Sequence, residues 1–202
     1  MSDNVTRAEL KEFWANWLEV NRVAERTKDW GPLADCYALD ATYGWMFTPD
    51  EHFMAMGREE IREFALGTEM AGLDGWHYDY MATVMDEENG MVVGFWKQLS
   101  GLPDEDGNEY EIRGIGGSWL GVVRDTDGEL RIGWQRDWFD LGSTAHTFME
   151  IVKSGKAPKP FMDRISIPSM EMPKHFRYAD LPSTLWPPPV AEGRFVTQKP
   201  LA

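Results

Sequence analysis

The alternation of apolar and polar positions divides the chain into a helical first part and a strand-rich second part. Over residues 6–26, apolar side chains recur at steps of three and four, which is typical of one face of an amphipathic helix. Thr6 and Glu9 predict a capping box at its start. The pattern then predicts a short helix over 30–37, a strand over 41–47, a loop over 48–57 and a helix over 57–70.

After Gly75 the pattern changes to strands separated by turns rich in Asp, Asn and Gly. Such residues supply the positive φ angles that hairpin loops require. The expected strands cover residues 76–85, 91–99, 109–123 and 130–141, and one further helix covers 144–154, with Gly155 placed to end it. Helices followed by an antiparallel meander predict an α+β domain in which a bent sheet wraps the helices.

Beyond Lys156 the composition shifts toward proline but retains large apolar residues. A linker does not need so many anchors, so the organisation predicted is a domain over 1–155 and an extended arm over 156–202. We expect the arm to pack on the domain or on a neighbouring subunit, and a flexible tail is the alternative. The anchors are Phe161, Ile165, Phe176, Tyr178 and Trp186.

Charge and composition narrow the expected partners. The 202 residues carry a formal net charge of -14, which repels phosphate backbones and anionic membrane surfaces, so neither nucleic acid nor membrane is expected. The single cysteine, Cys36, excludes an internal disulfide, and no apolar run is long enough for a membrane span. We therefore expect a cytoplasmic protein that forms a homo-oligomer, dimer or trimer. Ten tryptophans favour a pocket for an aromatic or apolar small molecule, although a tryptophan-rich core is the alternative.

Four strings in order, "LADCYALDATYGW", "GREEIREFALG", "GMVVGFW" and "GWQRDWFDLG", resemble the nuclear-transport-factor-2-like superfamily over about residues 8–150. Within it, the chain is similar to the SnoaL-like enzymes, limonene epoxide hydrolase and scytalone dehydratase. The resemblance implies a cone-shaped, curved antiparallel sheet wrapped around N-terminal helices, with one deep pocket. It also implies acid/base chemistry that uses no cofactor, although some members only bind ligands.

The resemblance carries specific residues with it. The general-base aspartate of the epoxide hydrolase strand falls on Asp137 and its tyrosine partner on Tyr43, while the asparagine that positions water is replaced by Trp45. An arginine and a second aspartate of that enzyme fall on Trp96 and Gln98, so the epoxide-opening relay is absent. A histidine of scytalone dehydratase resembles His77 in "GWHYDY".

Elementary chemistry supports the first of these assignments. A carboxylate in an aromatic pocket is destabilised as an anion, so its pKa rises and Asp137 becomes a base near neutral pH. The alternative is a salt bridge from Asp137 to Arg136, Arg131 or Arg113. Asp140, nearer the strand end, is expected to cap the following turn.

Two further residues are predicted to take part in the chemistry. His77, with Asp79 two residues on, is predicted to orient an imidazole for proton transfer, or else to be a hydrogen-bonded core or rim residue. Tyr43 is predicted to donate to a developing oxyanion, with simple packing as the alternative.

The remaining pocket residues are predicted from strand parity and from the resemblance. Arg113 and Trp119 share one parity, which the resemblance places toward the pocket. Glu25 falls where relatives line the pocket, with a solvated helix end as the alternative. The predicted substrate-binding set is Trp45, Trp96, Gln98, Arg113, Trp119, Glu25 and Phe139. No spacing of ligands predicts a metal site, and "GIGGS" is interpreted as glycines for sheet bending and close helix approach, not as a nucleotide loop.

The function predicted is a cofactor-independent acid/base lyase that acts on a small aromatic substrate. Within the superfamily, the lyases that release formaldehyde from lignin-derived diaryl propanediols suit such a pocket. One alternative is a SnoaL-like isomerase, cyclase or dehydratase acting on a polyketide or steroid. Another is a non-catalytic small-molecule binding protein or the small subunit of an assembly.

Overall fold

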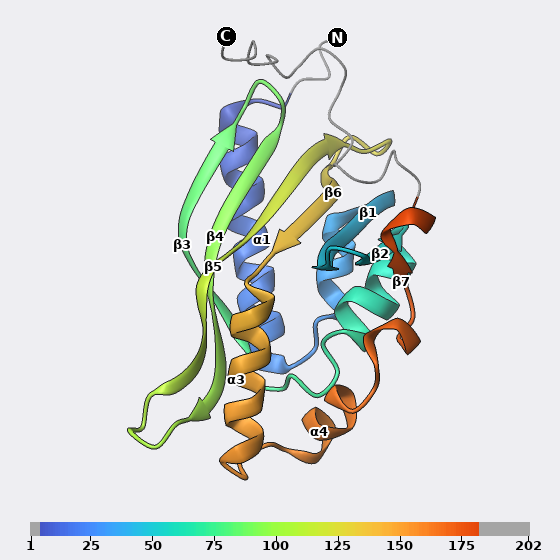
Figure 1. Ribbon diagram of the computed structural model, residues 1–202. Helices are drawn as coiled ribbons and strands as arrows, with labels where there is room; N and C mark the ends of the chain where they lie inside the picture. The colour runs from blue at the N-terminus through green and yellow to red at the C-terminus, as the bar shows by residue number, and fades with distance from the viewer. Residues whose placement is uncertain (1–4, 182–202) are drawn as a thin grey trace, which may run out of the picture.

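The protein is described by a computed structural model that covers residues 5–181 of the chain. Its centre is a curved seven-stranded sheet with the order β3-β4-β5-β6-β1-β2-β7 (Figure 1). All neighbouring strands are antiparallel except β1 and β6, which run parallel. The strands are β1 (Tyr37–Thr48), β2 (Glu51–Met56), β3 (His77–Asp86), β4 (Met91–Pro103), β5 (Glu109–Arg124), β6 (Leu130–Trp138) and β7 (His175–Arg177). The α+β class and the curved sheet are therefore confirmed.

Helices from three parts of the chain accompany the sheet. The long helix α1 lies behind the β3–β5 part of the sheet in Figure 1, and α3 stands in front of its lower half. The predicted capping box is confirmed, because Thr6 Oγ1 accepts from Glu9 N at 3.3 Å and Glu9 accepts from Thr6 N at 2.9 Å. The helical segments are α1 (Arg7–Thr27), η1 (Gly31–Cys36), α2 (Arg58–Glu60) continued by the π-helix η2 (Ile61–Thr68), α3 (Leu141–Lys153), α4 (Lys159–Ile165), η3 (Ser169–Glu171) and η4 (Tyr178–Asp180).

Two turn predictions concern single residues near α3. Asp140 caps α3, since its Oδ1 accepts from Ser143 N at 2.6 Å, and this prediction is confirmed. Gly155, with a φ of 71°, follows the last turn of the same helix and is also confirmed as the residue that ends it.

Residues 48–57 were expected to form a loop, and this prediction is wrong. The turn occupies only Pro49 and Asp50. The strand β2 then pairs with β1 on one side and with β7 on the other. The polar residues Glu51 and His52 are buried in this strand. These two polar residues interrupt the apolar pattern that would predict a strand. A charge is tolerated in a buried strand only where it finds a partner.

The segment after Lys156 lies against the rest of the chain. Phe161 of α4 is buried with Trp76 and Ile151 in a second apolar cluster, and β7 adds to the edge of the sheet through β2. The segment is not extended throughout, since α4 is helical. The anchor Trp186 lies outside the described residues.

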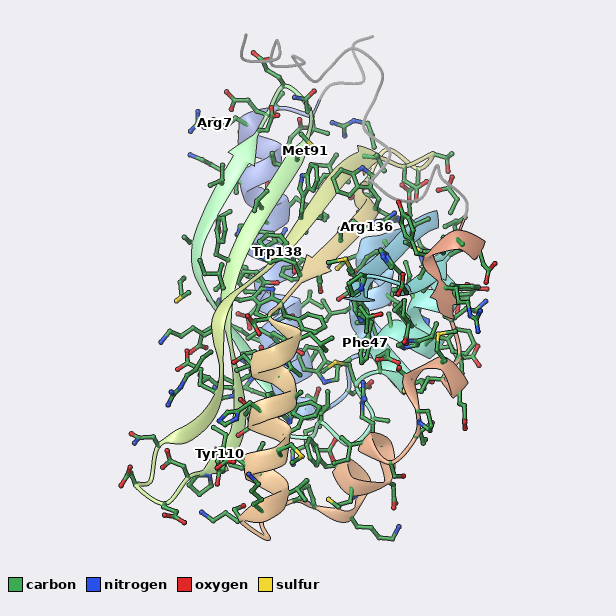
Figure 2. The ribbon with its side chains drawn as sticks, in the orientation of Figure 1. Arg7, Phe47, Met91, Tyr110, Arg136 and Trp138 are labelled. Atoms are coloured by element: carbon green, nitrogen blue, oxygen red, sulfur yellow. The ribbon has the colours of Figure 1, made fainter. Side chains whose placement is uncertain are left out.

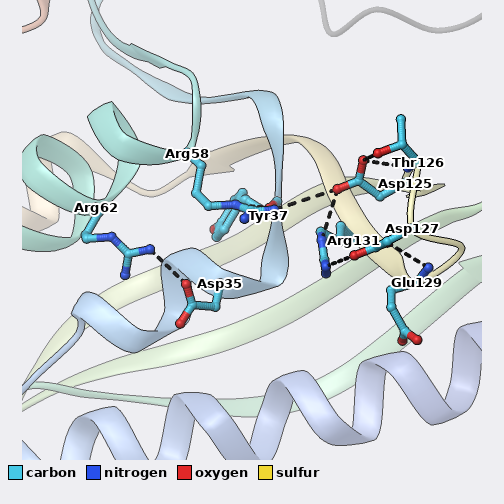
Figure 3. Close-up of polar contacts among 9 residues, drawn as sticks. All are labelled: Asp35, Tyr37, Arg58, Arg62, Asp125, Thr126, Asp127, Glu129 and Arg131. Carbon is cyan, nitrogen blue, oxygen red and sulfur yellow. Dashed lines mark hydrogen bonds and ion pairs between the residues drawn. The ribbon is translucent and has the colours of Figure 1, made fainter.

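A polar network fixes the start of β1 against the β5–β6 turn (Figure 3). Arg58 Nε donates to Tyr37 O at 2.6 Å, and its guanidinium lies 3.7 Å from Asp125. Asp125 also accepts from Arg131 Nε at 3.0 Å, and Arg131 is paired with Asp127 as well. The first residue of β1 is thereby held in register with β6, which matters because Tyr37 supports the site described below.

Glycine on β5 meets an aromatic ring on β4. Gly116 is the cross-strand partner of Trp96, and a Cβ added at Gly116 would lie 2.0 Å from the Trp96 ring. Gly117 is covered in the same way, since its Cβ would lie 2.1 Å from the Trp138 ring. These glycines therefore serve ring packing across the sheet and not the close helix approach expected for them.

Candidate functional site

A cavity of about 450 Å³ lies between the concave face of the sheet and the helices that cover it. This volume is within the range of small-molecule sites. Its wall is largely aromatic and comes from every layer of the fold. The large rings on it include Trp17, Trp30, Trp45, Phe47 (labelled in Figure 2), Trp96 and Phe139.

Asp137 presents its carboxylate to this cavity from β6. Tyr43 Oη donates to its Oδ2 at 2.5 Å, and Gln135 Nε2 donates to its Oδ1 at 2.9 Å. Gln135 is held in turn by Tyr37, whose hydroxyl donates to Gln135 Oε1 at 2.7 Å. Strand register explains the arrangement, because Ser118 of β5 and Trp45 of β1 flank Asp137 on the same face of the sheet.

The environment of Asp137 favours a base that titrates above the usual range of an aspartate. Burial raises the pKa of Asp137, while the hydrogen bonds from Tyr43, Gln135 and Ser118 and the charge of Arg136 oppose it, and the net direction is upward. An anion held this way is available for proton abstraction but is less stable than a carboxylate in water.

The salt-bridge alternative for Asp137 does not describe this structure. Arg136 projects from the opposite face of β6, where its guanidinium donates to Thr42 O at 3.2 Å and to Thr42 Oγ1 at 3.1 Å. Arg131 donates to Asp125 in the β5–β6 turn, and Arg113 is exposed. Among the described residues, Asp137 forms no ion pair within 4.0 Å.

Hydroxyl groups line the cavity close to the carboxylate. Ser118 Oγ accepts from Trp96 Nε1 at 3.1 Å and lies 3.3 Å from Tyr80 Oη. Gln98 Nε2 donates to Tyr78 Oη at 3.3 Å. Burial, followed by the charge of Asp137, raises the pKa of each tyrosine on this wall, so all four keep their protons at neutral pH and remain donors. They are Tyr37, Tyr43, Tyr78 and Tyr80.

Six of the ten residues predicted for the site lie on the cavity wall. Asp137 and Tyr43 are in direct contact, as the resemblance implied for a base and its tyrosine partner. The others bring flat or amide surface to the same space and come from β1, from β4 and from the residue that follows β6. They are Trp45, Trp96, Gln98 and Phe139.

His77, predicted to be catalytic, does not lie on the cavity wall. It is paired with Leu99 on β4, whereas its neighbours Tyr78 and Tyr80 face inward opposite Gln98 and Trp96. Successive strand residues point to opposite faces, so His77 points away from the cavity. Its Nε2 lies 3.4 Å from Glu109 Oε2, and Asp79 does not orient it.

Arg113 and Trp119, predicted to bind substrate, also face away from the cavity. The inward positions of β5 are even-numbered, since Gly116 is opposite Trp96 and Ser118 is opposite Asp137. Trp119 is opposite Arg136 on the other face and packs edge-on against Trp134, with ring centroids 5.2 Å apart. The parity predicted for this strand is therefore wrong.

Glu25 lies behind the wall and supports it. Its Oε1 accepts from Tyr78 N at 2.8 Å and from Asn21 Nδ2 at 3.0 Å, and burial raises its pKa. Asn21 and Tyr78, not Glu25, line the cavity. The solvated helix end, the alternative for Glu25, does not describe it either.

Two charged wall residues were not predicted from the sequence. Glu69 follows η2 and Arg164 belongs to α4, and their side chains are paired at 2.8 Å on the cavity wall. No local pattern distinguishes Glu69 and Arg164 from solvated charges, because the two partners are 95 positions apart in the chain.

Within residues 5–181, no group of three or more His, Cys, Asp or Glu side chains is arranged to hold a metal ion. None of the helices in that part of the chain is long and apolar enough to cross a membrane.

Solved structures similar to this chain include proteins described as NTF2-like and proteins described as having a cystatin-like fold. No protein family and no curated protein matches the sequence itself. Among solved structures, a protein of unknown function with a cystatin-like fold from Nostoc punctiforme is 15% identical, with a TM-score of 0.49 over 68% of this chain and 95% of that one.

Two further solved structures are similar to this chain over about two thirds of its length. ActVI-ORFA from Streptomyces coelicolor is 15% identical, with a TM-score of 0.47 over 66% of this chain and 96% of that one. An NTF2-like protein from Anabaena variabilis is 18% identical, with a TM-score of 0.46 over 64% and 87% of the two chains. These similarities concern the fold alone.

Proposed function

We propose that this protein is a cofactor-independent enzyme in which Asp137 moves protons on a small aromatic molecule held in the cavity. One observation carries the proposal. A carboxylate with a raised pKa faces an aromatic cavity, and Tyr43 and Gln135 hold both of its oxygens in place. A positioned base of this kind typically accelerates proton transfer by about 10²- to 10⁴-fold.

The reaction that suits this cavity best is the release of formaldehyde from a diaryl propane-1,3-diol. The rings of Trp45 and Trp96 supply flat walls for two aryl groups. Asp137 takes the proton of the primary hydroxyl, and the carbon–carbon bond breaks to release formaldehyde. The bonding electron pair forms the new alkene, and the benzylic hydroxyl leaves as water with the proton that Asp137 returns.

The fragmentation balances with one proton, which Asp137 takes from the primary hydroxyl and returns to the benzylic hydroxyl as it leaves. One diol gives one stilbene, one formaldehyde and one water, and no oxidant or reductant is consumed. The two hydroxyls of a 1,3-diol are close enough for one carboxyl group to serve both. Tyr43 is therefore a positioning residue in this scheme, because it orients the carboxylate through Oδ2.

Ring closure or isomerisation of a polyketide or steroid is the second candidate, favoured by the donors beside Asp137. Tyr80 and Ser118 lie on the same wall, 3.3 Å apart. Donors so placed would stabilise an enolate formed when Asp137 removes a carbon-bound proton. A protein that only binds its ligand remains the non-catalytic alternative.

The test compares the wild type with Asp137→Asn on a diaryl propane-1,3-diol that carries a hydroxyl and a methoxyl on each ring. Formaldehyde and stilbene are measured together, and ligand affinity is followed by tryptophan fluorescence. We expect Asp137→Asn to lose at least about 100-fold in turnover with affinity changed less than about threefold. Asp106→Asn in the exposed turn between β4 and β5 is the matched control.

Each outcome decides between the candidates. No formaldehyde from the wild type contradicts the lyase, and turnover of a polyketide or steroid substrate then selects the second candidate. Tight binding without turnover of any substrate selects the binding protein. Full activity of Asp137→Asn contradicts the assignment of the base.

A further inference from the structure

Arg164 brings a positive charge to the cavity wall from outside the sheet. It belongs to α4, in the segment that follows the helix α3, and the charged residues on the wall are Arg164, Glu69 and Asp137. Its side chain is 17% exposed. The cavity therefore has a second polar region besides the carboxylate of Asp137.

Glu69 fixes the guanidinium of Arg164 through two bonds. Arg164 Nε donates to the backbone oxygen of Glu69 at 2.9 Å, and Nη2 donates to Glu69 Oε2 at 2.8 Å. A guanidinium held at two of its nitrogens loses little further freedom when it binds a ligand. No hydrogen bond joins its third nitrogen, Nη1, to another residue among 5–181.

Glu69 is itself held from behind by an interior histidine. Its Oε1 lies 3.2 Å from His175 Nε2, and His175 Nδ1 lies 2.8 Å from Glu51 Oε1. The side chain of His175 is fully buried, and that of Glu69 is 5% exposed. Both oxygens of Glu69 are occupied by these protein donors, so the group left to meet a ligand is Arg164 Nη1.

The charges in this row of side chains balance one another. Burial alone would lower the pKa of His175, but the hydrogen bonds and charges of Glu69 and Glu51 outweigh burial and raise it. Even when His175 is protonated, the carboxylates of Glu51 and Glu69 match the cations of Arg164 and His175, so the region has no net positive charge. A neutral oxygen acceptor suits such a region, because an added anion would have no uncompensated positive charge to meet.

Arg164 and Asp137 act on one and the same cavity hydroxyl. Burial and then the charge of Asp137 raise the pKa of Tyr78, whereas the charge of Arg164 lowers it. Tyr78, Asp137 and Arg164 all lie on the wall of the same cavity.

We propose that Arg164 is a specificity-determining residue that donates from Nη1 to a neutral oxygen substituent, a phenol or a methoxyl, on the aromatic ligand. This assignment rests on the proposed function for the choice of an aromatic ligand. Asp137 serves the reacting hydroxyl, while Arg164 recognises the substitution of a ring. An unsubstituted ring would leave Nη1 desolvated and without an acceptor.

The experiment measures binding and needs no turnover. The probes are unsubstituted stilbene and the stilbene that carries a hydroxyl and a methoxyl on each ring, each titrated by tryptophan fluorescence. The variants are Arg164→Met and Arg164→Lys, with Lys159→Met as the control on the same helix, where the Lys159 side chain is 83% exposed.

We expect the wild type to prefer the substituted stilbene and Arg164→Met to lose roughly 10- to 100-fold in affinity for it, the size of one charge-assisted hydrogen bond. Binding of unsubstituted stilbene should stay unchanged or become tighter, because Arg164→Met removes a donor that this ligand leaves without an acceptor, and Lys159→Met should change the affinity for neither stilbene. If Arg164→Met does not fold, Arg164→Lys decides, because an ammonium paired with Glu69 cannot also present the planar second donor. We expect it to lose at least about fivefold of the preference.

Three results overturn the assignment: a wild type without preference for the substituted stilbene, a preference that survives in the folded variant, or an equal loss for both stilbenes. The equal loss would mean that Arg164 only supports the wall. Failure of the Asp137-dependent reaction leaves these binding results unaffected, so the two proposals fail separately.

Discussion

Tyr43→Phe tests whether the carboxylate of Asp137 is the base. The substitution removes one hydroxyl, which donates to Asp137 Oδ2 at 2.5 Å. That bond stabilises the anion. Burial already raises the pKa of Asp137 above the usual range, and loss of the bond raises it further. A hydrogen bond to a charged group is worth about 1.5–3 kcal/mol, which corresponds to about one to two pH units.

The sign of the effect follows from the form of Asp137 that works. A base acts as the anion, so kcat/KM falls as the pH drops through the pKa of Asp137. In Tyr43→Phe the midpoint of this acidic limb should therefore move to higher pH by about one to two units. The measurement is the pH profile of kcat/KM for formaldehyde release, from about pH 4.5 to about pH 9.

Tyr37→Phe is the matched control for this profile. Tyr37 is stacked on Tyr43, with ring centroids 5.9 Å apart, and its hydroxyl donates to Gln135 and not to Asp137. The two variants lose the same group from neighbouring rings, but only Tyr43→Phe removes a direct bond to the carboxylate. An acidic limb that stays in place in Tyr43→Phe, or that moves equally in both variants, would refute the assignment of Asp137.

Two further predictions concern histidines outside the cavity wall. His77→Gln should leave kcat/KM within about twofold of the wild type, because His77 faces Glu109 on the outer side of β3. A loss of more than tenfold in kcat/KM would show that His77 takes part in catalysis. His175→Gln should lower thermal stability most below about pH 6.5. The raised pKa of His175 means that its stabilising contribution is complete there and is lost as the pH rises through the folded-state pKa. Melting curves from about pH 5.5 to about pH 9 check this, and a difference in Tm that does not narrow with rising pH would contradict it.

The strand pattern of the sequence predicted most of the sheet, and its failures have physical causes. Strands β3 to β6 are separated by turns rich in Asp and Gly, and the bounds of each strand were predicted to within a few residues. Strand β2 was missed because Glu51 and His52 are buried polar residues in an interior strand. The partner that makes Glu51 tolerable there is His175, which lies 124 positions along the chain.

The candidate site was predicted where a resemblance or a local string defined it. Asp137, Tyr43, Trp45 and Trp96 belong to strings quoted from the sequence, and all of them line the cavity. The pair of Glu69 and Arg164 was missed, because a contact across 95 positions leaves no local periodicity. Long-range ion pairs of this kind become visible only when the fold has brought their elements together.

The error on β5 shows how the cavity forms. The resemblance places Arg113 and Trp119 on the inward face, yet the inward positions are Gly116 and Ser118. A ring as large as that of Trp96 needs an absent side chain opposite it, and Gly116 supplies one.

The same small residues keep the carboxylate open to a ligand. Ser118 lies opposite Asp137 in the β5–β6 ladder, and a large apolar side chain at that position would fill the space in front of the carboxylate. The inward face of β5 therefore trades core packing for cavity volume beside the group proposed to do the chemistry. Beside Asp137 the inward positions of β5 are the small residues Gly116 and Ser118, whereas the next inward residue, Leu120, is fully buried in the core, so the strand forms a wall of the site at one point and a wall of the core at the next.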